Sequence, residues 1–139
     1  ACARKAIEET ARRGIRVGAH IILGLPGEDA EESLRQAPII SSLPLTTLKI
    51  HQLQIIRGTR LAKMYAEKPF HLYTIEEYIK LIADYISLLR SDLVLERFVS
   101  QSPPELLIAP KWGLKNYEFT HRLHNYMKEC LNNKELLDK

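Results

Sequence analysis

Cysteine is scarce in this sequence. The 139 residues include only Cys2 and Cys130, near opposite ends, so no CxxC pair that could begin a metal site is present. Two cysteines are also too few for the disulfide framework of a small secreted domain. Both absences favour a reducing compartment. We therefore expect a cytoplasmic protein, with no metal bound by this chain.

Long apolar runs are also missing. The strongest run, from Ile21 to Leu25, stops at Pro26, far short of the roughly 20 apolar residues that a membrane helix needs. The first residues show a charged amphipathic pattern instead of a signal peptide. Because the apolar runs are short, we expect no membrane-spanning helix. Since the chain does not begin with Met, we expect it to be part of a longer protein.

No excess of one charge dominates the chain. The 20 basic and 17 acidic residues are interspersed, for a net charge of +3. A continuous basic stripe, which would indicate contact with a phosphate backbone, is therefore absent. With 45% apolar and 27% charged residues, the composition is that of an ordinary globular domain.

Helical and strand patterns alternate along the chain. Apolar periodicity favours helices over residues 3–13, 29–43, 59–67, 74–90 and 114–131. Apolar or alternating runs favour strands over residues 15–25, 46–56 and 93–100. This order predicts an α/β fold with parallel strands. Because a complete βα barrel needs roughly 250 residues, the chain can form only a segment of one, with an open edge at its first strand.

Local signals refine these elements. The run over residues 15–25 is almost continuously apolar, which predicts a strand buried on both faces. Asp29 with Glu32 and Thr74 with Glu77 have the spacing of capping boxes. Pro38 is expected to kink or shorten its helix. In the last helix, we expect Tyr117, His121, Leu123, His124 and Met127 to share one side with Leu114.

Two strand motifs carry a resemblance to a known family. The stretch His20-Ile-Ile-Leu-Gly-Leu-Pro-Gly-Glu28, followed by Leu48-Lys-Ile-His-Gln-Leu-Gln-Ile-Ile-Arg-Gly-Thr59, resembles the fifth and sixth strands of radical S-adenosylmethionine (SAM) proteins of the YhcC-like branch. That branch is related to the Elongator-type and methylthiotransferase enzymes. Thr74-Ile-Glu-Glu-Tyr78 and Leu107-Ile-Ala-Pro-Lys-Trp112 extend the similarity through most of the chain.

The resemblance implies a fold and two cofactors. Residues 1–100 would be the C-terminal half of a partial (βα)6 radical SAM barrel, and residues 101–139 a loop and helical extension. In the family, a CxxxCxxC loop after the first strand holds a [4Fe–4S] cluster, and one iron binds SAM. This sequence has no such loop. We therefore expect the catalytic residues before Ala1, SAM and the cluster in the full-length protein, and neither bound to this fragment alone.

The resemblance also implies a wall for the SAM adenine. Glycine and proline at the end of the first strand let the backbone approach a ligand at the rim where barrel enzymes bind theirs. The wall would consist of backbone groups of one strand and packing residues of the next: Ile22, Leu23, Gly24 and Leu25, with Gln54, Ile55 and Ile56. The alternative is a plain strand-to-helix turn in which glycine and proline serve geometry alone.

Four residues are candidates for substrate contact. By strand alternation His20 shares a face with Gly18 and Ile22, and His51 shares one with Lys49. Arg97 is added by resemblance, although the Gly-Asp pair usual just after it in the family reads Ser100-Gln101 here. The alternatives are satisfied core histidines, or an inward face defined by Gln52 and Gln54 instead.

Two functions are compatible with the sequence. In the first, the parent enzyme cleaves SAM reductively to a 5′-deoxyadenosyl radical, which abstracts hydrogen from an unknown substrate; family relatives make RNA a candidate. The second is a small α/β binding or interaction module without redox chemistry. The expected partners are the missing N-terminal half of the protein and, through the open sheet edge, a second copy of the chain.

Overall fold

Three parallel strands form the centre of the fold in a computed structural model that describes residues 2–137. The strands lie side by side in the order β1 (Gly18–Leu23), β2 (Thr47–Gln52) and β4 (Val94–Arg97). Both strand pairs are parallel, with Leu23 opposite Gln52 and Thr47 opposite Val94. The α/β fold with parallel strands is therefore confirmed.

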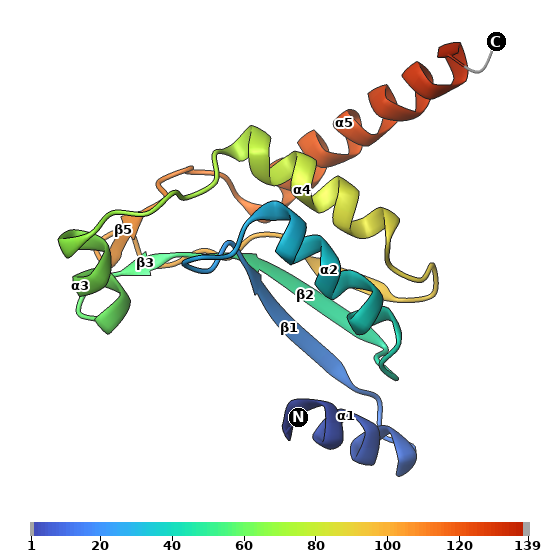
Figure 1. Ribbon diagram of the computed structural model, residues 1–139. Coiled ribbons are helices and arrows are strands. Elements are labelled where there is room, and N and C mark those ends of the chain that lie inside the picture. Colours follow the sequence, from blue (N-terminus) through green and yellow to red (C-terminus); the bar gives the residue numbers. More distant parts are fainter. Residues whose placement is uncertain (1, 138–139) are drawn as a thin grey trace.

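Helices cover only one face of this sheet. Figure 1 shows α2 (Ala30–Ser41) and α4 (Ile75–Ser87) on the same side, with α5 (Asn116–Leu137) against α4 and projecting away from the sheet. The helix α1 (Cys2–Arg12) lies beyond the start of β1. None of the helices among residues 2–137 has the length and apolar character needed to cross a membrane.

The core lies between the sheet and α2 and α4. Alternation along β2 sends Leu48 and Ile50 to this side, where both side chains are fully buried. The opposite side of β1 is open, and Ile22 there is 48% exposed. The prediction of a strand buried on both faces is therefore wrong for the described residues, since no described element covers the second face. The strand is also shorter than expected, because regular pairing begins only at Gly18.

Helix ends follow the predicted signals with one difference. Thr74 and Glu77 form a complete capping box at α4. Asp29 caps α2 by accepting from the Glu32 N–H at 2.7 Å, but the Glu32 carboxylate pairs with Arg35 instead of returning to the cap. Pro38 lies inside α2, which continues to Ser41. The second capping box is thus half formed.

A second, smaller sheet extends beyond the carboxyl ends of β1 and β2. The predicted strand over residues 46–56 is interrupted after Gln52, and its last part becomes β3 (Ile55–Ile56). This strand pairs antiparallel with β5 (Leu107–Ala109), which the sequence did not predict. The helix α3 (Arg60–Glu67), capped by Thr59 as expected, packs beside it.

The segment after residue 100 returns to the main core. Phe119 and Leu123 of α5 are fully buried among residues of the sheet and α4. These contacts join the C-terminal helix to the same core as the strands. The predicted division at residue 100 into barrel and extension stays a prediction.

Hydrogen bonds from Arg90 stabilise the segment that links α2 to β2. Its guanidinium donates to the carbonyl oxygens of Ser41 at 2.8 Å and Leu43 at 2.6 Å, and also to that of Leu45. The backbone N–H of Arg90 donates to Ser41 Oγ at 3.0 Å. One planar side chain therefore binds the last carbonyl of α2 and two carbonyls of the segment that follows it.

We expect Arg90→Lys to lower the free energy of unfolding by about 1–3 kcal/mol, because a single ammonium cannot reach all three carbonyls. Urea denaturation followed by circular dichroism measures the change. Arg35→Lys is the control, since Arg35 is exposed on α2 and its ion pairs are worth about 0–1 kcal/mol. Equal losses in both variants would show that the carbonyl contacts contribute little.

Candidate functional site

The carboxyl ends of β1 and β2 meet at one edge of the sheet. Leu23 is opposite Gln52 in the parallel register, and Leu53 N–H donates to the Leu23 carbonyl at 3.1 Å. The turn that follows β1 therefore lies beside the segment between β2 and β3. This is the edge at which parallel α/β proteins bind ligands.

Gly24 is required at the start of this turn. Its φ of 85° lies in the left-handed region, and an added Cβ would lie 2.9 Å from Cε2 of Tyr73. The Tyr73 ring thus packs directly on the backbone where β1 ends. Any larger residue would displace either the ring or the turn.

Glu28 holds the other end of the turn. Its carboxylate accepts from the Leu25 N–H at 3.0 Å, from Ser33 Oγ at 2.9 Å and from Gln36 Nε2. These bonds connect the two ends of the turn to each other and to the first turns of α2. These bonds make the half-buried Glu28 a structural residue of the loop, whose carboxylate is already satisfied within the chain.

Removing the charge of Glu28 is expected to weaken this loop. We expect Glu28→Gln to lower the free energy of unfolding by about 1–3 kcal/mol, because an amide offers fewer acceptors and directs a donor at a donor. Thermal or urea unfolding measures the loss. Glu31→Gln, which removes an exposed carboxylate of the same helix, should change stability by less than about 1 kcal/mol. A loss for Glu28→Gln no larger than that would contradict the role.

The predicted adenine wall is only partly accessible. Ile22 and Leu25 are 48% and 45% exposed, whereas the side chains of Leu23 and Ile55 are fully buried in the two cores. Leu23 and Ile55 could therefore meet a ligand only through backbone atoms. Ile56 is half-buried in β3. The assignment of these residues and Gly24 to SAM stays a prediction.

Gln54, the remaining residue of that wall, is engaged within the chain. Its amide donates to the Ser100 carbonyl at 3.3 Å and accepts from Ser102 Oγ at 2.7 Å. Gln52 is buried and binds both the N–H and the carbonyl of Ser100 at 2.8 and 3.0 Å. The two glutamines thus join the end of β2 to the segment after β4, and neither defines the open face.

These glutamines also line a cavity of about 520 Å³. Its other walls come from two loops near the sheet edge, residues 100–102 and 110–115. Lys111 and Trp112, which the sequence places in the second loop, both contribute to the lining. Trp112 also packs against Tyr78 and Phe119, so the loop is anchored to the core.

On the open face of the sheet, the two predicted histidines meet. The rings of His20 and His51 stack with centroids 5.2 Å apart, and His51 Nε2 lies 3.3 Å from His20 Nδ1. The other ring nitrogen of His51 is hydrogen-bonded to Ser100 Oγ. Burial, followed by the charges of His20, Arg97 and Lys49, lowers the pKa of His51. Both effects favour the neutral form of the His51 ring.

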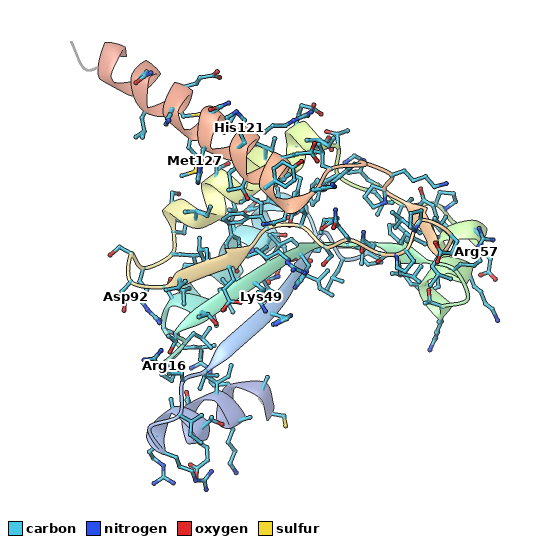
Figure 2. All side chains as sticks on the ribbon, turned by 180° about the vertical axis from the view of Figure 1, so that it is seen from behind. Arg16, Lys49, Arg57, Asp92, His121 and Met127 are labelled. Carbon is cyan, nitrogen blue, oxygen red and sulfur yellow. The ribbon has the colours of Figure 1, made fainter. Side chains whose placement is uncertain are left out.

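Lys49, the third predicted substrate residue, is paired on the same face. Its Nζ lies 3.0 Å from Glu96 Oε2, and this contact lowers the pKa of the Glu96 carboxyl. The register of β2 and β4 shifts here, so that Lys49 is opposite Arg97. Figure 2 labels Lys49 on the sheet, away from the helices. The structure thus brings all four predicted substrate residues to one face.

The sequence did not predict two residues of this face, Glu96 and Ser100. Ser100 occupies the position of a family glycine, which was read only as a departure. Glu96 depends on the register shift opposite Lys49, which no alternation pattern reveals. A search for charges near Lys49 in the neighbouring strand could have found it.

The described residues do not fit an iron–sulfur cluster. Among residues 2–132, whose side chains the structure describes, no three side chains of His, Cys, Asp or Glu gather in a group that could hold a metal ion. Cys2 is exposed in α1, and Cys130 lies in α5 on the far side of the fold. A cluster would therefore need ligands from outside these residues.

Comparison with known proteins connects this arrangement to a family. The family model of the radical SAM C-terminal domain matches residues 45–129. MJ0486 of Methanocaldococcus jannaschii is 32% identical over 90% of this chain and 39% of its own length. YtqA of Bacillus subtilis is 29% identical, and YhcC of Escherichia coli K12 is 25% identical over 93% of the chain. The chain spans about 36–42% of the length of these relatives.

A solved structure shows the same fold. Elp3 of Methanocaldococcus infernus, with an N-terminal deletion, superposes with a TM-score of 0.79 at 22% identity, over 91% of this chain and 30% of its own. At that identity the likeness concerns the fold alone, and it fits part of a radical SAM barrel. The family match covers the second and later strands and most of α5. The chain therefore belongs to the radical SAM C-terminal domain family and is YhcC-like.

Proposed function

We propose that this chain forms the C-terminal wall of a radical SAM barrel, in a protein whose N-terminal part holds the [4Fe–4S] cluster. The observation that supports this most is the sheet edge where β1 and β2 end together, with the Gly24 turn beside Gln54. When bound and reduced, SAM supplies a 5′-deoxyadenosyl radical that abstracts a hydrogen atom from the substrate.

In this proposal the chain contributes positioning and exclusion of water. Ile22 and Leu25 offer exposed apolar surface at the end of β1, and Gln54 and Ile56 lie across from them after β2. Leu23, Gly24 and Ile55 would contribute backbone atoms only. The open face with His20, His51, Lys49 and Arg97 then becomes the substrate wall. A cytoplasmic location, an RNA substrate and a dimer through the edge of β1 remain predictions.

The full-length protein tests the proposal. Purified without oxygen and reconstituted with iron and sulfide, it should contain about four irons per chain and release 5′-deoxyadenosine from SAM when reduced with dithionite. The 139-residue chain, treated identically, is the matched control and should bind no stoichiometric iron. A full-length protein without a CxxxCxxC loop, iron or 5′-deoxyadenosine would overturn the proposal and favour the α/β binding module.

A further inference from the structure

A register shift concentrates charge on the open face of the sheet. Lys49 of β2 is opposite Arg97 of β4, with Glu96 as the additional residue of β4 at that point. Such an irregularity sets two residues against one and turns an extra side chain toward one face. Phe98, next in sequence, is buried in the core on the helix side, so alternation sends Arg97 to the open face.

The charges on this face do not balance. Glu96, the one carboxylate contributed by the three strands, pairs with Lys49 at 3.0 Å. Among the described side chains, Arg97 forms no ion pair. Its charge is nevertheless close enough to lower the pKa of His51. The face therefore holds one guanidinium without a counter-charge.

The two histidines leave one free ring nitrogen on the same face of the sheet as this charge. Both nitrogens of His51 are engaged, with Ser100 Oγ and with His20 Nδ1. Within the described residues, His20 Nε2 has no hydrogen-bond partner. In the corresponding tautomer Nε2 carries a proton and can donate. Three strands thus present one guanidinium and one ring N–H on the same face.

We infer that Arg97, with the His20–His51 pair, binds an oxyanion of the substrate, either a carboxylate or a phosphate. The inference rests on the proposed function, because closing the barrel turns this open face into interior. Burying an unpaired guanidinium costs several kcal/mol unless a counter-charge accompanies it. The planar fork of arginine matches both carboxylate and phosphate in two parallel hydrogen bonds. A substrate oxyanion would supply the negative charge that Arg97 lacks on this face.

Anion titration of the full-length protein tests this site. Inorganic phosphate and acetate are titrated separately by calorimetry, with chloride adjusted to keep the ionic strength constant. We expect saturable binding of at least one anion, weakened at least tenfold in Arg97→Gln and less in Arg97→Lys. Arg16→Gln is the matched control: Arg16 is exposed near α1, away from Lys49 (Figure 2), and its loss should leave binding unchanged.

Histidine ring resonances give a second measurement. Burial, followed by the charges of His20, Arg97 and Lys49, lowers the pKa of His51. Ser100 is hydrogen-bonded to the ring, and the nearby Glu96 carboxylate pairs with Lys49. A bound anion offsets the positive charges, so the titration midpoint of His51 should rise when the anion is added. In Arg97→Gln the anion should no longer move that midpoint. An unchanged midpoint in the native protein would contradict binding at this face.

The outcomes separate the inference from the proposed function. Binding of phosphate alone indicates a phosphorylated substrate, binding of acetate alone indicates a carboxylate, and either supports the site. Absence of saturable binding, or equal weakening by Arg97→Gln and Arg16→Gln, overturns it. 5′-Deoxyadenosine is measured on the same preparations. SAM cleavage without anion binding at Arg97 rejects the inference alone, whereas anion binding without SAM cleavage rejects the proposed function alone.

Discussion

Tyr78→Ala is expected to lower the free energy of unfolding by about 3–5 kcal/mol, the usual loss for a buried aromatic side chain. Tyr78 is fully buried, and its ring packs against those of Tyr73, Trp112 and Phe119. It thereby joins α4 to α5 and to the loop before it. Because a domain of this size has a total stability of about 5–15 kcal/mol, the variant should be largely unfolded in moderate urea.

Tyr78→Phe and Tyr85→Phe form a matched pair that separates the hydroxyl from the ring. Tyr78 Oη donates to the Phe98 carbonyl at 2.8 Å, and burial raises the pKa of Tyr78, so the donor proton is retained. Tyr85, also fully buried on α4, has a hydroxyl without a partner among the described residues. Tyr78→Phe should cost about 1 kcal/mol, while Tyr85→Phe should be neutral or stabilising.

Urea unfolding midpoints of the three variants measure these effects, with the slope showing whether the unfolding remains two-state. A Tyr85→Phe loss equal to that of Tyr78→Phe would show that the hydroxyl of Tyr85 is satisfied in solution. A Tyr78→Ala loss below about 1 kcal/mol would show that the aromatic cluster adds little to the core.

Local chemistry made most of the fold predictable. Cap signals and apolar periodicity located α2, α3 and α4 to within a few residues, because those signals act over one or two helical turns. The parallel direction of the strands followed from the alternation of helices and strands along the chain. The pairing of β3 with β5 was missed because it joins very short strands about 50 residues apart, and such segments carry almost no pattern of their own.

The last helix was predicted with Tyr117, His121, Leu123, His124 and Met127 on one side, and that grouping is wrong. Tyr117 is 66% exposed and His121 and His124 are exposed, whereas Leu123 is fully buried. The buried stripe instead follows Phe119 and Leu123, with Met127 partly buried. The face could not be chosen from the sequence, because aromatic and apolar residues occur all around the first turns of α5.

The site was predictable to the level of a sheet face. Strand alternation placed His51 and Lys49 on one face of their strand, since side chains at every second position share a face, and the structure shows that His20 of the neighbouring strand lies on the same side. Alternation could not supply Glu96 or the contact between His51 and Ser100, which depend on the register shift and on the path of the chain after β4. Nor could it show that the Leu23 and Ile55 side chains are enclosed in separate cores.

Gly24→Ala is expected to raise the KM for SAM of the full-length enzyme at least tenfold, with a smaller effect on kcat. The added methyl group would lie 2.9 Å from the Tyr73 ring and would place a non-glycine residue at a φ of 85°. The turn or the ring must move to admit it. If this turn faces SAM, a displacement there weakens binding by about 1.4 kcal/mol or more, which corresponds to the tenfold change.

Gly14→Ala separates backbone strain from displacement of the wall. Gly14 has a similar φ of 74°, but a Cβ there meets no atom within 4 Å, and the residue follows α1. This control should lose stability without a change in KM. If Gly24→Ala folds poorly, the double variant Gly24→Ala with Tyr73→Leu removes the clash with the ring. This variant should fold well enough for its KM to be measured. An unchanged KM in a folded Gly24→Ala enzyme would contradict the proposed contact between SAM and this turn.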